Sequence, residues 1–444
     1  MSFKDTPIDA TSAERLRENN LRLGLVDTSD TDAFTAWYQA DARGFYGARP
    51  AQKQLDEQLS RTAYRRTTGV WDETAADPLT PVATVSTWPT PMMLPGGHDV
   101  QVWAISSVTV APTHRRRGIA RALLEAELRT AKSLGVPVAA LTVSEATIYS
   151  RYGFGTAAQA VDLEINTRRA RWVGPQASGR LHFVTLEQLR ENGRAVFERA
   201  RLANAGDIEL DDQLWERLVG VIGDSDDEAK HLRAVRYDDA GGVMQGFAIY
   251  RVTGGEQDFT QHTAEVRYLC AATDDASAGL WRYLLELDLV STVSASLRSV
   301  DDPILWQVSD VRAVRTKHRS DHLWVRILDV AAALEARAYS AAGRFVLDID
   351  DQLGFASERA VVSIDDSGRA TVSDAGGSDA GGSHAGDLPG LALPIDMLGA
   401  LYLGGVSART LVRAGRVTEL SPGSADLIDA SFRSPSAPWL STWF

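Results

Sequence analysis

The stretch formed by residues 108–120 constrains the fold of this chain more than any other part of the sequence. A β-branched apolar run over residues 102–110 leads through a proline and a basic turn into residues 119–133, where apolar side chains recur at helical spacing. The first N–H groups of a helix have no intrahelical partner and lie at the positive end of the helix dipole. Because Gly118 and Ala120 lack bulk, a phosphate group can approach these N–H groups closely. The order strand, basic turn, helix therefore predicts a phosphate-binding loop on an α/β scaffold.

The basic turn, Arg115-Arg116-Arg117, strengthens this prediction. Arginine keeps its charge at every cellular pH, and its planar guanidinium matches the oxygens of a phosphate. A basic triplet by itself is more often a solvated run that caps a helix. The strand before this triplet and the helix after it favour a binding site.

The run Arg115-Arg116-Arg117-Gly118-Ile119-Ala120 resembles the acetyl-CoA signature of GNAT acetyltransferases, Arg/Gln-x-x-Gly-x-Gly/Ala. The resemblance implies that acetyl-CoA is the co-substrate, that the backbone of Val108 and Val110 pairs with the pantetheine arm, and that the N–H groups of residues 116–120 hold the pyrophosphate. The candidate cofactor-binding residues are Val108, Thr109, Val110, Arg115, Arg116, Arg117, Gly118, Ile119, Ala120, Ser144 and Glu145.

Residues 144–154 supply a candidate general acid. Acetyl transfer to an amine needs a neutral nucleophile and a proton for the leaving thiolate. We expect a short helix here, with Ser144 as its N-cap and Gly153 at its C-terminal end, and Tyr149 lies one turn before that glycine. Tyrosine has an unperturbed pKa of about 10, so it retains its proton at neutral pH. Resemblance to GNAT enzymes implies that Tyr149 protonates the CoA thiolate, with Tyr152 as the second candidate; a packed aromatic side chain is the alternative.

The chain of 444 residues is predicted to form several α/β (α+β) units, since single domains span roughly 100–200 residues. The expected segments are an N-terminal extension (1–24), a first unit (25–175), a second unit (176–320) and a third unit (321–444).

The second unit reads as a degenerate internal repeat of the first. When Cys270 is set opposite Val110, a strand, a short loop and an apolar helix follow in both copies. Asp274 and Asp275 then stand where the first copy has basic side chains. Because carboxylates repel a pyrophosphate, we do not expect the second unit to bind CoA.

The third unit is expected to open with a strand at residues 323–328 and a helix at residues 330–339, with further strands at residues 344–349 and 360–364. Residues 373–390 repeat Asp-Ala-Gly-Gly-Ser and predict a flexible loop within this unit.

Over most of its length the chain resembles the enhanced intracellular survival (Eis) family of N-acetyltransferases. The stretches that carry the resemblance are residues 111–118, 148–153, 323–326, 333–337 and 398–405. The resemblance implies tandem GNAT folds, the N-terminal one catalytic and the central one degenerate, followed by a sterol-carrier-protein-like α/β domain. It also implies a homo-oligomer, a hexamer, and a terminal phenylalanine whose α-carboxylate is the general base.

The chain does end in a phenylalanine, Phe444, at the close of an aromatic segment over residues 437–444. An α-carboxyl group with a pKa of about 3.5 is a poor base for an ammonium. Such a group could act through a water molecule or orient the amine by charge, and a frayed terminus is the alternative. The penultimate residue is Trp443, where family members that acetylate aminoglycosides carry an acidic side chain, and no acidic equivalent is evident near Phe45 and Tyr46.

Composition excludes several other functions. A single cysteine rules out an intramolecular disulfide, and the eight histidines lack the spacing of metal ligands, so we predict no metal site. A net charge of −13 argues against nucleic-acid binding but suits a cationic substrate. The polar N-terminus and the absence of a long apolar run predict a cytoplasmic protein without a signal peptide or membrane span.

The sequence thus predicts an acetyl-CoA-dependent N-acetyltransferase that acts on the primary amine of a cationic small molecule, of the aminoglycoside or polyamine type, by direct attack in a ternary complex. Tyr149 is the candidate acid and Phe444 the candidate base. One alternative is acetylation of lysine or a peptide. Others are a CoA sensor without turnover and a lipid-binding module whose cavity residues 391–403 would line. The acceptor amine stays open.

Overall fold

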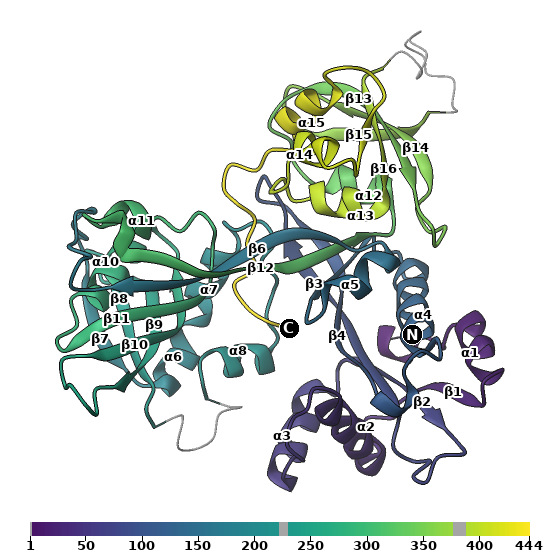
Figure 1. Cartoon of the computed structure of the whole chain (residues 1–444), viewed down its shortest axis with the longest axis horizontal. Coiled ribbons are helices and arrows are strands. Elements are labelled where there is room, and N and C mark those ends of the chain that lie inside the picture. The colour runs from purple at the N-terminus through teal and green to yellow at the C-terminus, as the bar shows by residue number, and fades with distance from the viewer. Residues whose placement is uncertain (1, 222–229, 376–387) are drawn as a thin grey trace.

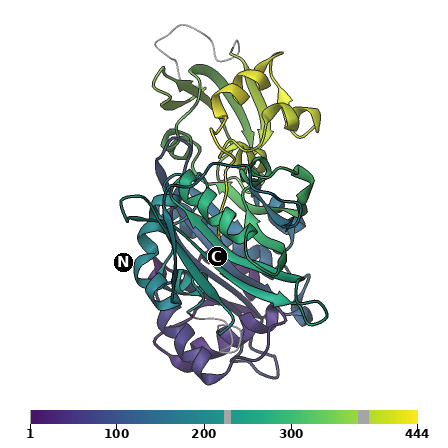
Figure 2. The ribbon, with the colours of Figure 1, turned by 90° about the vertical axis from the view of Figure 1, so that its left-hand side faces the viewer.

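A computed structural model describes residues 2–221, 230–375 and 388–444 of the chain. In these residues the strands form one sheet of twelve strands and one of five (Figure 1). The smaller sheet belongs to a domain at one end of the molecule, and it keeps that place when the molecule is turned by 90° (Figure 2).

The N-terminal part of the chain forms one half of the large sheet. The strand predicted at residues 102–110 and the helix predicted at residues 119–133 are confirmed. The elements of this part are η1 (Phe3–Asp5), α1 (Ala10–Arg17), β1 (Leu21–Leu25), α2 (Thr31–Gly44), α3 (Gln52–Thr62), β2 (Arg66–Asp72), β3 (Ala83–Met93), β4 (Asp99–Val110), η2 (Pro112–His114), α4 (Ile119–Ser133), β5 (Val138–Thr142), α5 (Ala146–Tyr149), η3 (Ser150–Tyr152) and β6 (Gly155–Asn166).

The prediction that residues 1–24 form an extension outside the first unit is wrong. This segment forms α1 and β1, and β1 pairs antiparallel with β2. Leu16 and Leu21 are buried, and Arg15 forms an ion pair with Glu125 of α4 at 2.9 Å. Glu125 lies on the polar face of α4, and α1 covers this face and buries the carboxylate. The segment is polar because its charged side chains pair with α4.

The second unit forms the other half of the large sheet. Its elements are β7 (Arg180–Val184), α6 (Leu186–Asn192), α7 (Arg194–Arg201), α8 (Asp212–Leu218), β8 (Arg233–Asp238), β9 (Met244–Gly254), β10 (His262–Ala271), α10 (Asp274–Leu285), β11 (Val290–Arg298), α11 (Ile304–Gln307), η4 (Val311–Ala313) and β12 (Val314–Ile327). The strand, loop and helix predicted to repeat are present as β10 and α10, and β10 pairs parallel with β11 as β4 does with β5.

The two halves of the large sheet exchange their last strands. The strand order is β1-β2-β3-β4-β5-β12-β6-β11-β10-β9-β8-β7, so β12 of the second unit lies beside β5 of the first, and β6 lies beside β11. Figure 1 shows β6 and β12 crossing between the two lobes. The strand predicted at residues 323–328 is therefore the end of β12 in the large sheet, and the boundary predicted at 320/321 falls within this strand.

The third unit contains the five-stranded sheet, in the order β15-β14-β13-β16-β17. Its elements are α12 (Val330–Ala336), β13 (Gly343–Asp350), β14 (Glu358–Ile364), β15 (Ala370–Asp374), β16 (Gly390–Pro394), α13 (Ile395–Leu401), α14 (Ala408–Arg413), β17 (Thr418–Glu419) and α15 (Ser424–Phe432). Most of the predicted loop at residues 373–390 lies outside the described residues, which resume at residue 388.

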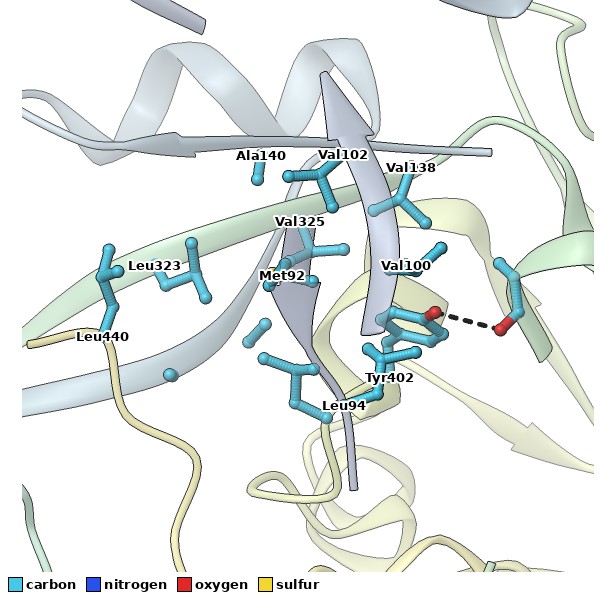
Figure 3. Close-up of a cluster of buried hydrophobic side chains, with 14 of the residues drawn as sticks. Met92, Leu94, Val100, Val102, Val138, Ala140, Leu323, Val325, Tyr402 and Leu440 are labelled. Carbon is cyan, nitrogen blue, oxygen red and sulfur yellow. Dashed lines mark hydrogen bonds between the residues drawn. The ribbon is translucent and has the colours of Figure 1, made fainter. Parts of the chain in front are cut away.

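The third unit packs directly on the large sheet. Figure 3 shows side chains of β4, β5 and β12 meeting Tyr402 of the third unit and Leu440 of the C-terminal segment, and the Tyr402 hydroxyl donates to the Ala333 carbonyl at 3.0 Å. A Cβ at Gly155 of β6 would lie 1.8 Å from the Asp396 carbonyl oxygen of α13, so only glycine permits this approach. Most apolar side chains of residues 391–403 are buried in this shared core, which weakens the lipid-cavity alternative.

In the described ranges no helix combines the length and the apolar character needed to cross a membrane. The same ranges contain no group of three or more histidine, cysteine, aspartate or glutamate side chains arranged to hold a metal ion.

Candidate active site

A gap opens between β4 and β5. The two strands pair in parallel from Val102 to Ile105, and the described pairing ends there. A bulge follows, at which Ser107 adopts a φ of +56° and the register with β3 shifts. Beyond the bulge, Thr109 and Val110 pair with β3 on one side only, so an extended ligand could pair with the backbone of residues 108–110 on the other.

The loop after β4 leaves the N-terminus of α4 open. Arg116 and Gly118 have left-handed φ values of +64° and +75°. Gly118 is the N-cap, no side chain caps the helix, and nothing lies within 4 Å of where a Cβ would stand. Successive N–H groups therefore face outward at the positive end of a helix of 15 residues. Arg115 and Arg116 are exposed beside them.

Ile119 and Ala120 could contribute only backbone N–H groups to such a site. The Ile119 side chain is buried in the core of the first unit, and Ala120 is half-buried.

The Arg117 side chain is directed away from this opening. It donates to Asp72 at 3.3 Å and to the Asn19 carbonyl at 3.0 Å, and His114 bonds to the same Asp72 carboxylate at 3.1 Å. Hydrogen bonds from Thr74, His114 and Arg117 hold the pKa of Asp72 well below its usual range. The Arg117 side chain therefore fastens the loop to β2, which the sequence could not reveal because Asp72 lies 45 residues earlier.

The candidate acid lies just beyond β5. Tyr149 is buried with its ring against Phe154, at 6.2 Å between centroids. Burial, then the charge of Glu145, raises its pKa to about 12, so the hydroxyl keeps its proton at neutral pH. Burial raises the pKa of Tyr152 too, but its next influences are Glu125 and Arg121 of α4.

The helix that carries Tyr149 starts one residue later than predicted. The N-cap of α5 is Glu145 rather than Ser144, and neither side chain caps the helix, so the predicted capping role of Ser144 is wrong. Both side chains are exposed. Gly153 has the predicted left-handed conformation, with a φ of +80°.

The C-terminus lies at the end of β5 and is anchored there. The Thr142 hydroxyl donates to a terminal carboxyl oxygen of Phe444 at 3.1 Å. The Phe444 ring meets the Trp88 ring of β3 edge to face, with centroids 5.9 Å apart. In Figure 1 the yellow segment descends from the third unit and ends between the two lobes of the large sheet. The frayed-terminus alternative does not fit these contacts.

The residues before Phe444, here called the tail (433–444), are fixed by the second unit. The backbone N–H and the hydroxyl of Ser441 both donate to Asp207 at 2.9 Å, and the Tyr268 hydroxyl donates to Ser441 at 2.9 Å. The indole N–H of Trp439 donates to the Leu297 carbonyl of β11 at 2.8 Å. These contacts set the tail against β10 and β11, the counterparts of β4 and β5.

Trp443 stacks edge to face on His322 at 4.5 Å and remains half exposed. It lines a cavity of about 210 Å³ together with residues of α8, β10 and β11. Thr142, Asp207 and Ser441 carried no sequence signal, because each acts through a partner more than 200 residues away.

In the second unit, side chains of the loop itself occupy the N-terminus of α10, which corresponds to the open N-terminus of α4. Thr273 caps α10 by accepting from the Ala276 N–H at 3.2 Å. Asp275 accepts from the N–H and the hydroxyl of Ser178, each at 3.1 Å, and from the Tyr237 hydroxyl. An anion would meet a carboxylate at this helix end, in contrast to the open end of α4.

Family models describe all three units. Residues 26–157 and residues 206–327 each match a model described as an acetyltransferase (GNAT) domain, and residues 330–441 match a sterol carrier protein domain.

Relatives of known sequence cover most of the chain. An uncharacterized N-acetyltransferase of Streptomyces avermitilis is 35% identical over 419 residues, which are 92% of this chain and 96% of that protein. N-acetyltransferase Eis of Mycobacterium tuberculosis is 33% identical over 351 residues, 77% of this chain and 81% of that one.

Solved structures agree with this likeness. Eis1 of Mycobacterium abscessus is 29% identical and superimposes with a TM-score of 0.78 over 96% of this chain and 100% of that chain. A GCN5-related N-acetyltransferase of Anabaena variabilis, at 18% identity, shares the fold with a TM-score of 0.77 over 95% of this chain and 100% of that chain.

Proposed function

This chain belongs to the family of GNAT N-acetyltransferases that includes Eis, and from that premise we propose that it moves an acetyl group from acetyl-CoA to the primary amine of a small molecule. One observation carries the proposal: the Phe444 carboxylate lies at the end of β5, on one side of the gap that β4 and the open N-terminus of α4 border on the other.

The residues around this gap fit acetyl-CoA. The N–H groups of residues 116–120 would hold the pyrophosphate, and the backbone of Val108 and Val110 would pair with the pantetheine arm. When bound, acetyl-CoA supplies an acetyl group already activated as a thioester. By the same argument the second unit, whose helix end is closed by Thr273 and Asp275, binds no CoA.

Tyr149 is the proposed acid. Its raised pKa keeps the hydroxyl protonated, and it donates that proton to the sulfur as the C–S bond breaks. The Phe444 carboxylate is the proposed partner of the amine. It attracts the ammonium by charge and can take a proton through a water molecule, with Thr142 fixing its position.

The acceptor is proposed to be a cationic amine of the aminoglycoside or polyamine type, which a net charge of −13 attracts to the protein. Acetylation of lysine in a peptide is the second candidate. Trp443 narrows the range of acceptor amines, because it places an aromatic ring where family members that acetylate aminoglycosides carry an acidic side chain.

The test is CoA release by the wild type and by a chain that lacks Phe444, with polyamines, aminoglycosides and lysine peptides as acceptors. We expect turnover with at least one amine, and at least a tenfold loss on deletion while acetyl-CoA still binds, since correctly placed acid–base groups contribute about 10²–10⁴-fold. Tyr149→Phe should lose rate in the same way. Tight acetyl-CoA binding without turnover of any amine would contradict the proposal and favour a CoA sensor.

A further inference from the structure

The β12 strand brings a buried histidine, His322, next to the end of the tail. Its Nε2 lies 2.8 Å from the carbonyl oxygen of Thr442, and its ring meets that of Trp443 edge to face, with centroids 4.5 Å apart. The histidine is 1% exposed, whereas Trp443 is half exposed. His322 therefore contacts both residues that directly precede Phe444.

The strand exchange places this histidine beside the other contact of the terminus. Leu323, the next residue of β12, pairs with Thr142 of β5, whose hydroxyl donates to Phe444 at 3.1 Å. His322 is the extra residue where the register between β12 and β6 shifts, between Asp321 and Leu323. The last three residues of the chain are thus held by two neighbouring strands, one from each GNAT unit.

The hydrogen bond to Thr442 fixes the form of the imidazole. A carbonyl oxygen can only accept, so the Nε2 of His322 carries a proton. Burial lowers the pKa of His322, against the opposing influences of that hydrogen bond and of the charges of Asp162 and Asp321, so the ring is neutral at pH 7. The neutral ring then has its proton on Nε2 and a bare Nδ1.

The Nδ1 of His322 is a buried acceptor without a hydrogen-bond partner among the described residues. Such an acceptor costs folding free energy, and an apolar side chain such as leucine would avoid that cost. An unpaired buried polar group calls for an explanation. The other nitrogen supplies it, because only a side chain with a donor at that position can hold the Thr442 carbonyl.

The contacts further back in the tail leave the terminal carboxylate free to move. Asp207 holds Ser441, but three residues of extended chain span roughly 10 Å beyond that point. A misplacement of about 1 Å is enough to impair catalysis. The contacts of His322 with Thr442 and Trp443 limit this freedom, because they hold the two residues directly before the carboxylate.

We propose that His322 is a positioning residue for acetyl transfer. Its Nε2–H and its ring hold Thr442 and Trp443, so that the Phe444 carboxylate stays at the end of β5. This inference rests on the proposed N-acetyltransferase function, in which that carboxylate meets the amine. His322 itself touches neither the amine nor acetyl-CoA, and it transfers no proton. Its loss should therefore change how often the carboxylate is in place and leave acetyl-CoA binding unchanged.

Release of the terminal phenylalanine by a carboxypeptidase measures this positioning without any acceptor. The protease removes Phe444 only while the terminus is detached, so the rate follows the detached fraction. His322→Leu should raise the rate about tenfold, since one hydrogen bond and one aromatic contact are lost. Thr142→Val, which removes the other contact, gives a reference increase. His318→Leu, at an exposed histidine of the same strand, should match the wild type.

Two amide variants separate the hydrogen bond from general packing. The amide nitrogen of glutamine reaches the place of Nε2 in histidine, whereas that of asparagine reaches only the place of Nδ1. His322→Gln should therefore keep the bond to Thr442 and release phenylalanine within about threefold of the wild-type rate, and His322→Asn should resemble His322→Leu. Release from the His322→Leu chain at the wild-type rate would overturn the proposal, as would equal rates for the Gln and Asn chains.

Turnover tests the link to Phe444. With the acceptor amine that the panel identifies, His322→Leu should lose about tenfold in kcat, while acetyl-CoA affinity, measured by calorimetry, stays within about twofold. In a chain that lacks Phe444 the same substitution should cause no further loss, because His322 acts through that carboxylate. An equal loss with and without Phe444 would overturn the proposal. If the wild type turns over no amine, the acetyltransferase proposal fails, and the carboxypeptidase rates still decide whether His322 holds the terminus.

Discussion

The backbone conformation of one residue, Gly118, distinguishes the loop before α4 from the corresponding loop before α10. Its φ of +75° lets α4 begin without a side-chain cap, so the first N–H groups stay free. In the second copy Thr273 takes one such N–H, and Asp275 adds a negative charge. The same helix end is thus open in one copy and capped by a side chain in the other.

Gly118→Asp should make the loop before α4 similar to the loop before α10, in which a carboxylate lies at the helix N-terminus. We expect acetyl-CoA to bind at least tenfold more weakly, because the carboxylate occupies the helix end and repels the pyrophosphate. Gly118→Asn is the matched control, since asparagine tolerates the left-handed conformation similarly without the charge. Calorimetric titration with acetyl-CoA measures the effect. Equal affinities for the Asp and Asn chains would mean that the pyrophosphate binds elsewhere.

Among the elements, the tail joins the two GNAT units. Asp207 fixes Ser441, and burial raises the pKa of Asp207 to about 7. Trp439 lies between the Leu297 carbonyl and the guanidinium of Arg298, which is 5.2 Å from its ring. The second unit thereby holds the segment that places Phe444 at the end of β5 in the first unit, which is a structural role.

Trp439→Ala should therefore lower kcat more than it lowers stability or acetyl-CoA affinity. The tail loses its indole hydrogen bond and its cation–π contact, together about 1–3 kcal/mol, so Phe444 is held less often at Thr142. We expect a fall in kcat of about tenfold, with acetyl-CoA affinity within twofold, since a change of about 1.4 kcal/mol alters an equilibrium tenfold. Trp306→Ala, at an exposed tryptophan of the same unit, is the control. A loss of acetyl-CoA binding equal to the loss of kcat would argue against this role.

For the whole molecule, the exchange of β6 and β12 makes the two GNAT units interdependent. The β5 strand finds its outer neighbour in β12, more than 170 residues later in the chain, and β6 pairs with β11 and β12. The third unit adds α13 against β6 and β12, so the core that Figure 3 shows in part contains residues of all three units. The hexamer implied by the family resemblance stays a prediction.

A chain that ends at residue 175 should therefore fail to fold as a stable catalytic domain. Without β12 the β5 edge is left open, and the apolar side chains Val138 and Ala140 lose their cover, which favours aggregation. Size-exclusion chromatography and thermal unfolding check this, with the full chain as reference. A monomeric fragment that unfolds cooperatively and binds acetyl-CoA would show that the strand exchange is dispensable.

The sequence by itself determined what depends on neighbouring residues. The strand, basic turn and helix over residues 102–133, the repeat at Cys270 and the place of Tyr149 before Gly153 all follow from local periodicity and turn chemistry. The role predicted for the Phe444 carboxylate came from the family resemblance.

Only the tertiary structure decided what depends on distant partners. Phe444 meets Thr142 across 302 residues, Ser441 meets Asp207 across 234, and Arg117 turns from the expected ligand to Asp72. The strand exchange was hidden for the same reason: a β-strand pattern states which face is buried but not which strand lies beside it.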